Sequence, residues 1–159
     1  QWGGFLITMF FFIGLIGGCA GSTACSVKIF RYQLVYASVS AQLKQIRSPN
    51  GVFIPRYDGR AIDNDLLSSV MSFFIFFMVT LGIVAILLAT TGLDLITSIS
   101  ASASALANIG PGLGEEIGPS GNYGGISDLA KWILSATMLI GRLELLAVYA
   151  ILTIQFWRA

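Results

Sequence analysis

The sequence contains no histidine, and charged residues make up only 11% of its 159 positions. Histidine is the commonest general base and the commonest metal ligand, so the usual centre of acid–base and metal chemistry is missing. Charged residues form about a quarter of an ordinary soluble domain, whereas here 55% of the residues are hydrophobic. The mean hydropathy of +0.81 is positive, which also indicates an apolar chain. The composition excludes an ordinary soluble domain and indicates a membrane protein.

Four further features that are weak or absent narrow the class of protein. The net charge is only +1, which gives no reason to expect nucleic acid as a partner. The two cysteines, Cys19 and Cys25, match no zinc, redox or haem spacing, and we expect them to be small buried side chains. No basic segment precedes the first apolar run, so no secretory signal is recognisable. The sequence also lacks an initial methionine, which suggests an internal piece of a longer protein.

Most of the few charged residues cluster in two connections between apolar runs, one basic and one acidic. A basic stretch separates two long apolar runs, and because positively charged loops stay on the cytoplasmic side of a membrane, we expect this stretch to be cytoplasmic. The connection at 113–128 has acidic residues and no basic one, so we expect it outside. Crossings at the start of the chain, at 66–90 and at 129–157 satisfy both placements. The basic stretch holds six of the nine basic residues, namely Lys28, Arg31, Lys44, Arg47, Arg56 and Arg60.

The first crossing contains an interruption. Its apolar part, 5–16, would make a helix about 18 Å long, too short for a hydrocarbon core of about 30 Å. The glycine-rich sequence at 17–23 follows. Because glycine disfavours helix, we predict a break at membrane depth that lines a cavity. The alternative is an unbroken helix whose glycines allow a neighbouring helix to pack closely.

A further apolar element does not cross. Residues 91–106 are rich in serine and alanine, which suits a half-helix buried among other helices better than one facing lipid. Its electronegative C-terminal end would point at 107–112, a segment that contains Gly110, Pro111 and Gly112. Backbone carbonyls can replace the hydration shell of a cation, and glycine reaches the backbone angles that such a ring requires. We therefore predict a cation-selective filter at 107–112, with an ordinary extracellular turn as the alternative.

These motifs resemble the C-terminal part of the TrkH-type potassium uptake proteins, members of the Trk/Ktr/HKT superfamily. The similarity extends over nearly the whole sequence and is carried by segments that occur in the same order. They are Gly17-Gly18-Cys19-Ala20-Gly21-Ser22-Thr23, Val27-Lys28-Ile29-Phe30-Arg31, Ala107-Asn108-Ile109-Gly110-Pro111-Gly112-Leu113-Gly114, Lys131-Trp132, Met138-Leu139-Ile140-Gly141-Arg142-Leu143-Glu144 and Phe156-Trp157-Arg158.

The resemblance implies an all-α integral membrane protein, built from helix–pore hairpin–helix repeats around a pseudo-fourfold pore like that of a potassium channel. Residues 1–42 would be the last, broken helix of the third repeat, with an intramembrane loop at 17–26. Residues 43–65 would be a basic cytoplasmic loop. The fourth repeat, 66–159, would comprise a helix at 66–90, a pore helix at 91–106, the filter at 107–112, an outer loop at 113–128 and a helix at 129–157.

The resemblance also implies roles for individual residues. Arg142 would face the pore as a positive charge beside the intramembrane loop. Within that loop the family usually has further glycines where this sequence has Ala24, Cys25 and Ser26, so side chains there should restrict its movement. The gating loop would comprise Gly17, Gly18, Cys19, Ala20, Gly21, Ser22 and Thr23. The potassium-binding filter would comprise Ala107, Asn108, Ile109, Gly110 and Pro111.

The implied function is potassium transport across the bacterial inner membrane by a multi-pass protein, with potassium as cargo, no covalent cofactor and no enzymatic step. The partners would be the lipid bilayer, a second copy of the full-length protein, and cytoplasmic nucleotide-binding regulatory subunits of the TrkA type. Residues 52–60 are typical of a short hairpin with Asp58 and Gly59 at its turn, a reasonable contact for those subunits. Two alternatives are an ion-coupled secondary transporter of a small solute and a structural membrane subunit.

Overall fold

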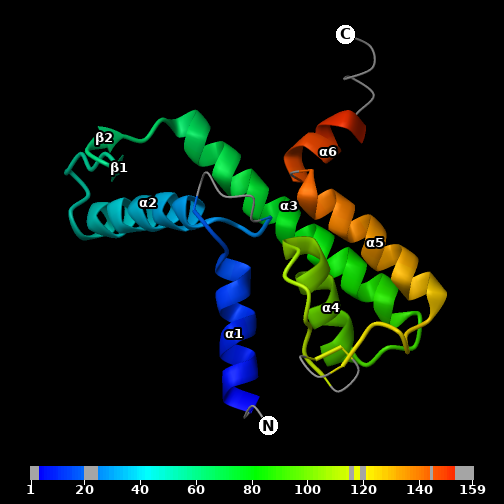
Figure 1. Cartoon of the computed structure of the whole chain (residues 1–159). Coiled ribbons are helices and arrows are strands. Elements are labelled where there is room, and N and C mark those ends of the chain that lie inside the picture. The colour runs from blue at the N-terminus through cyan, green and yellow to red at the C-terminus, as the bar shows by residue number, and fades with distance from the viewer. Residues whose placement is uncertain (1–3, 20–24, 115–116, 119–120, 144, 153–159) are drawn as a thin grey trace.

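The computed structural model describes residues 4–19, 25–114, 117–118, 121–143 and 145–152. Within these ranges the regular secondary structure is helical, apart from one short hairpin. In chain order its elements are α1 (Gly4–Ile16), α2 (Ile29–Arg47), β1 (Arg56–Tyr57), β2 (Arg60–Ala61), α3 (Asn64–Ala89), α4 (Leu95–Ala107), α5 (Asp128–Arg142) and α6 (Leu145–Leu152), as Figure 1 shows.

The longest helix, α3, runs uninterrupted because its sequence contains no proline and no charge after Asp65. At 1.5 Å per residue, its 26 residues span about 39 Å, more than a hydrocarbon core of about 30 Å. Its most apolar stretch of 18 residues has a mean hydropathy of 2.7. Among the described residues, α3 is the one helix long and apolar enough to cross a membrane by itself.

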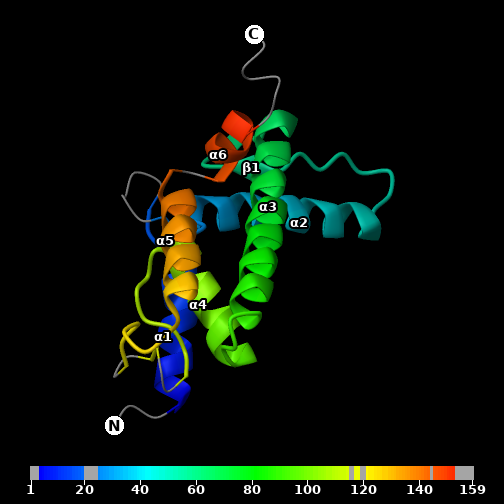
Figure 2. The ribbon, with the colours of Figure 1, turned by 90° about the vertical axis from the view of Figure 1, so that its right-hand side faces the viewer.

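The first predicted crossing is divided into two helices. α1 ends at Ile16 and α2 begins only at Ile29, so the alternative of one unbroken helix is wrong. Gly17 has a positive φ of 77°, which glycine adopts without a steric penalty. The Ile29 N–H donates to the Gly18 carbonyl, 3.1 Å away, and closes the intervening segment at its base. From there α2 runs across the direction of α1 and α3 (Figures 1 and 2).

The half-helix α4 is packed against both α3 and α5 and buried on most sides. Ten of its 13 residues are buried, so little of its surface could face lipid. Its serine and alanine side chains are small, which lets the flanking helices come close. The core that it shares with them is formed by Val84 and Leu88 of α3, Ala101 and Ala105 of α4, and Ala130 and Leu134 of α5.

The start of α4 differs from the prediction. The helix begins at Leu95 rather than at residue 91. Thr91 belongs instead to the turn after α3, where its hydroxyl donates to the Leu88 carbonyl at 2.6 Å. Gly92 then takes a positive φ of 92°, which interrupts the helical backbone, and Asp94 occupies the N-cap position.

The predicted helix at 129–157 is also wrong as one continuous element. α5 ends at Arg142, and α6 covers Leu145–Leu152 in a different direction (Figure 1). The change of direction brings α6 onto α3. There the Tyr149 hydroxyl lies 2.9 Å from the Thr80 hydroxyl, and the Tyr149 ring lies 4.7 Å from the Phe76 ring, centre to centre. The contacts of Tyr149 with α3 therefore favour a bend after α5 over one straight helix. Residues 153–157 lie outside the described ranges.

The basic connection contains the predicted hairpin. Strands β1 and β2 pair antiparallel, with Tyr57 opposite Arg60. Asp58 and Gly59 have positive φ values of 50° and 76°, the backbone of a two-residue turn that Asp-Gly favours. The Asp-Gly turn is thus confirmed.

Candidate functional site

Two buried serines of α4 hold the segment that follows the helix. Ser100 and Ser104 are four residues apart and therefore lie on one face of α4. The Gly110 N–H donates to the Ser104 hydroxyl oxygen at 3.1 Å. The Leu113 N–H donates to the Ser100 hydroxyl oxygen at 2.9 Å, and the Ser100 hydroxyl donates back to the Leu113 carbonyl at 3.0 Å. Side-chain hydrogen bonds thus join Gly110 of the predicted filter, and Leu113 just after it, to α4.

Asn108 ends α4 and joins it to α5. Its backbone is left-handed, with φ 53° and ψ 44°, a conformation that asparagine tolerates better than most residues. The Ile109 N–H donates to the Ser104 carbonyl at 3.0 Å, which satisfies a carbonyl of the last turn. The Asn108 side-chain amide donates to the Met138 carbonyl of α5 at 3.1 Å. One residue therefore turns the chain out of α4 and fixes the position of the turn.

A glycine lets α5 pass directly over the end of α4. Gly141 is buried, and a Cβ atom there would overlap the backbone carbonyl of Leu106. Any larger residue would push the two helices apart. The role of Gly141 is not predictable from the sequence, because a single glycine inside a helix pattern does not reveal what packs against it. The roles of Ser100 and Ser104 are equally hidden, since their only signal is a spacing of four residues.

Gly110 has the backbone that the filter prediction requires. Its φ is +111°, a region that residues with a Cβ atom rarely adopt. Its carbonyl accepts a hydrogen bond from the Tyr123 hydroxyl at 2.7 Å. Tyr123 lies in the connection to α5 and is half-buried. Burial raises the pKa of this tyrosine above its ordinary value, and a hydrogen bond with Ser104 lowers it to a smaller extent. The hydroxyl therefore keeps its proton, and remains a donor, at neutral pH.

A cavity of about 270 Å³ brings three predicted groups together. The 17–26 loop, the predicted filter and Arg142 all line it, although they are widely separated in the sequence. One Arg142 guanidinium nitrogen, Nη1, lies 3.3 Å from the Cys25 sulfur, to which it donates. The lining residues are Gly14, Gly17, Gly18, Cys25, Ser26, Ala107, Asn108, Ile109 and Arg142.

The two cysteines do not have the predicted burial. Cys19 is exposed and Cys25 is partly exposed, because the 17–26 loop borders the cavity instead of lying inside the core. The predicted gating residues Ala20, Gly21, Ser22 and Thr23 lie outside the described residues, as does Ala24.

The chain after the 17–26 loop is fixed to the end of α4. Val27 is buried in a cluster with Phe73, Phe77 and Leu106, the last of which comes from α4. Arg31 reinforces this anchor, since its guanidinium lies 3.9 Å from the centre of the Phe73 ring and donates to the Val27 carbonyl at 3.3 Å. The end of the loop therefore lies beside the C-terminal end of α4.

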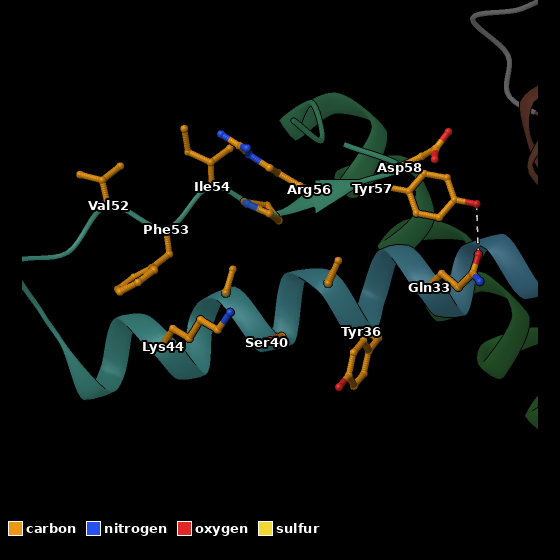
Figure 3. A pocket seen from close by; sticks show the side chains of 13 residues that line it. Gln33, Tyr36, Ser40, Lys44, Val52, Phe53, Ile54, Arg56, Tyr57 and Asp58 are labelled. Carbon is orange, nitrogen blue, oxygen red and sulfur yellow. Dashed lines mark hydrogen bonds between the residues drawn. The ribbon is translucent and has the colours of Figure 1, made fainter. Parts of the chain in front are cut away.

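A second cavity, of about 680 Å³, lies between α2 and the hairpin (Figure 3). It is lined by apolar residues such as Phe53 and by the basic residues Lys44 and Arg56. The Tyr57 hydroxyl donates to the Gln33 side-chain oxygen at 3.1 Å and fixes the hairpin to α2. This part of the chain thus presents basic and aromatic side chains on one surface.

A family model, related sequences and a solved structure all match this chain to the same group of transport proteins. The family model described as "TrkH: Cation transport protein" matches residues 1–156. The Trk system potassium uptake protein TrkI of Halomonas elongata is 43% identical over 99% of this chain, and TrkH of Vibrio parahaemolyticus is 36% identical over all of it. The crystal structure of the potassium transporter TrkH from Vibrio parahaemolyticus matches 98% of this chain with a TM-score of 0.87 and 34% identity. The chain spans about a third of these relatives, 32% of each sequence and 33% of the solved chain.

Proposed function

The chain belongs to the TrkH family of cation transport proteins, and from this premise we propose that it contributes one filter segment and one gating loop to a potassium-conducting pore. The observation that carries the proposal is the cavity where Gly17, Ile109 and Arg142 meet. A loop, a filter and a fixed positive charge around one space are the parts that a gated cation pathway needs. The remaining filter segments would come from the rest of the full-length protein.

The filter would bind potassium through backbone oxygens at 107–111. The C-terminal end of α4 carries a partial negative charge and is directed at this segment, which favours a cation there. Ser100 and Ser104 hold the segment against α4. Potassium would exchange its hydration water for carbonyl oxygens from this segment and from its counterparts in the other repeats.

The 17–26 loop and Arg142 would control passage below the filter. A unit charge about 5 Å from a passing cation costs about 3 kcal/mol at an effective dielectric constant of about 20. Arg142 would impose such a barrier, and its contact with Cys25 would hold the loop in the pathway. Movement of the loop and of the guanidinium together would open the route.

The remaining parts of the proposal concern location and partners. The full-length protein would be a multi-pass protein of the bacterial inner membrane and would act as a homodimer. Regulatory nucleotide-binding subunits of the TrkA type would contact the cytoplasmic surface formed by α2 and the hairpin. The basic residues Lys44 and Arg56 and the protruding position of the hairpin support this surface (Figures 1 and 3).

Rubidium uptake by the full-length protein in cells that lack other potassium transport tests the proposal. Gly110→Ser should lower uptake and the preference for rubidium over sodium, because φ is +111° at this position although a Cβ atom would have open space. Arg142→Ala should raise uptake by removing the barrier. Gly82→Ser is the matched control, since Gly82 lies in α3 and a Cβ there meets nothing within 4 Å. Normal selectivity with Gly110→Ser would overturn the filter assignment, and unchanged flux with Arg142→Ala would overturn the barrier.

The same experiment separates the alternatives. A secondary transporter predicts saturable uptake of an organic or anionic solute rather than rubidium. A structural subunit predicts that Gly110→Ser alters assembly and leaves permeation normal in whatever protein assembles.

A further inference from the structure

The orientation of the Gly110–Pro111 peptide depends on a hydrogen bond from one side chain, that of Tyr123. A peptide bond normally offers an N–H and a carbonyl, but proline has no N–H. This peptide can therefore be held by hydrogen bonds only through the Gly110 carbonyl. In the structure that carbonyl accepts from the Tyr123 hydroxyl at 2.7 Å, the usual distance for an O–H···O hydrogen bond.

The peptide on the other side of Gly110 is held separately. Its N–H donates to the Ser104 hydroxyl oxygen at 3.1 Å. Gly110 itself gives no resistance to rotation, because it has no side chain and a Cβ built there would meet nothing within 4 Å. The two hydrogen bonds, one on each side, thus restrain the two peptide planes that meet at this residue.

Tyr123 is well placed to hold a fixed direction. Its ring packs against the cluster that contains Leu88, Ala105 and Leu134, so the hydroxyl is supported by the core of α3, α4 and α5. Tyr123 and Ser104 thus restrain Gly110 from two sides, one from the connection before α5 and the other from α4.

We propose that Tyr123 is a positioning residue that sets the direction of the Gly110 carbonyl and thereby the ion selectivity of the filter. The inference rests on the proposed function and deepens it. A carbonyl oxygen has two lone pairs, so it can accept from Tyr123 and face a cation at the same time. Without the hydroxyl, the Gly110–Pro111 peptide is free to rotate, and the size of the oxygen ring is no longer fixed.

The test is the ratio of rubidium to sodium uptake by the full-length protein carrying Tyr123→Phe. The ring and its packing remain, and only the hydroxyl is lost. We expect the ratio to fall about fivefold, the equivalent of one neutral hydrogen bond. Tyr149→Phe is the matched control, because it removes a hydroxyl that lies 2.9 Å from Thr80, on α3. Its ratio should equal that of the unmodified protein.

The outcomes separate this inference from the proposed function. A normal ratio with Tyr123→Phe, together with a changed ratio for Gly110→Ser, overturns the role of Tyr123 and leaves the filter in place. A normal ratio for both variants overturns the filter and this inference with it. A ratio of two ions in the same cells does not depend on the amount of protein, so partial misfolding does not imitate the effect. If Tyr123→Phe yields no protein, Tyr123→Leu, which also lacks the hydroxyl and keeps an apolar side chain beside the same cluster, must lower the ratio.

Discussion

The predicted filter and the predicted gating loop are held in different ways. The predicted filter and the residue after it, Leu113, are bonded by Ser100 and Ser104 of α4 and by Tyr123 of the connection that follows. All these partners lie between residues 95 and 128. The 17–26 loop is closed at its base by one backbone hydrogen bond, from Ile29 to Gly18. Its contact with Arg142 comes from a helix more than a hundred residues away.

This difference suits the two proposed roles. An ion-selective segment must keep its oxygens at fixed spacing, so several hydrogen bonds to the preceding helix, the following connection and α5 are appropriate. A gate must move, and a contact between distant helices can break without unfolding either one. The helix α5 connects the two regions, because Gly141 touches the end of α4 while its neighbour Arg142 contacts Cys25.

The largest loss of uptake is expected from Gly141→Val, which disrupts the packing of α5 against the end of α4, next to the predicted filter. The added Cβ would overlap the Leu106 backbone carbonyl, and a backbone group cannot be relieved by a rotamer change. Overpacking typically costs about 1–3 kcal/mol, and here α5 must also shift. Rubidium uptake should be abolished, and the detergent-solubilised protein should melt at a lower temperature. Gly82→Val on α3 is the control, and normal uptake by Gly141→Val would show that the two helices are not closely packed.

A smaller effect is expected from Ser100→Ala, which removes one anchor of the filter segment. The change leaves the Leu113 N–H and carbonyl without their Ser100 partner. A buried polar group without a partner costs about 1–3 kcal/mol. Uptake should fall and the selectivity for rubidium should weaken. Ser102→Ala is the control, because Ser102 is equally buried but donates to the Ile99 carbonyl of its own helix. Equal selectivity in the two variants would contradict the anchoring role of Ser100.

Local composition predicted the elements better than it predicted their contacts. The charge-free run at 66–90 is observed as α3, Asn64–Ala89, because hydropathy alone determines a long apolar helix. Gly17 lies at the end of α1, where the glycine-rich sequence begins. The division between α5 and α6 was not predictable, since it depends on the contact of Tyr149 with Thr80 and Phe76 of α3.

The same limit applies to the candidate site. Gly110 was identifiable because a positive φ favours glycine. Tyr123 and Ser104 were not, because a tyrosine in a polar connection and a serine in a small-residue helix have many possible partners. Only the packing of α4 against α5 brings the hydroxyl of Tyr123 to the Gly110 carbonyl. Contacts between elements depend on the fold and cannot be predicted from the periodicity of the sequence.

The smallest effect is expected from Cys25→Ala, which tests whether the gating loop is held by its side-chain contact. A thiol sulfur is a weak acceptor, and one neutral hydrogen bond corresponds to about 1 kcal/mol, or about fivefold in an equilibrium. Loss of the Arg142–Cys25 contact should therefore raise rubidium uptake by less than this. Cys25→Ser keeps an acceptor and should behave like the unmodified protein, while Cys19→Ala changes an exposed cysteine of the same loop and should have no effect. If Cys25→Ala and Cys19→Ala give equal uptake, the contact with Arg142 does not hold the loop, and the backbone hydrogen bond at its base would be the restraint that opening must overcome.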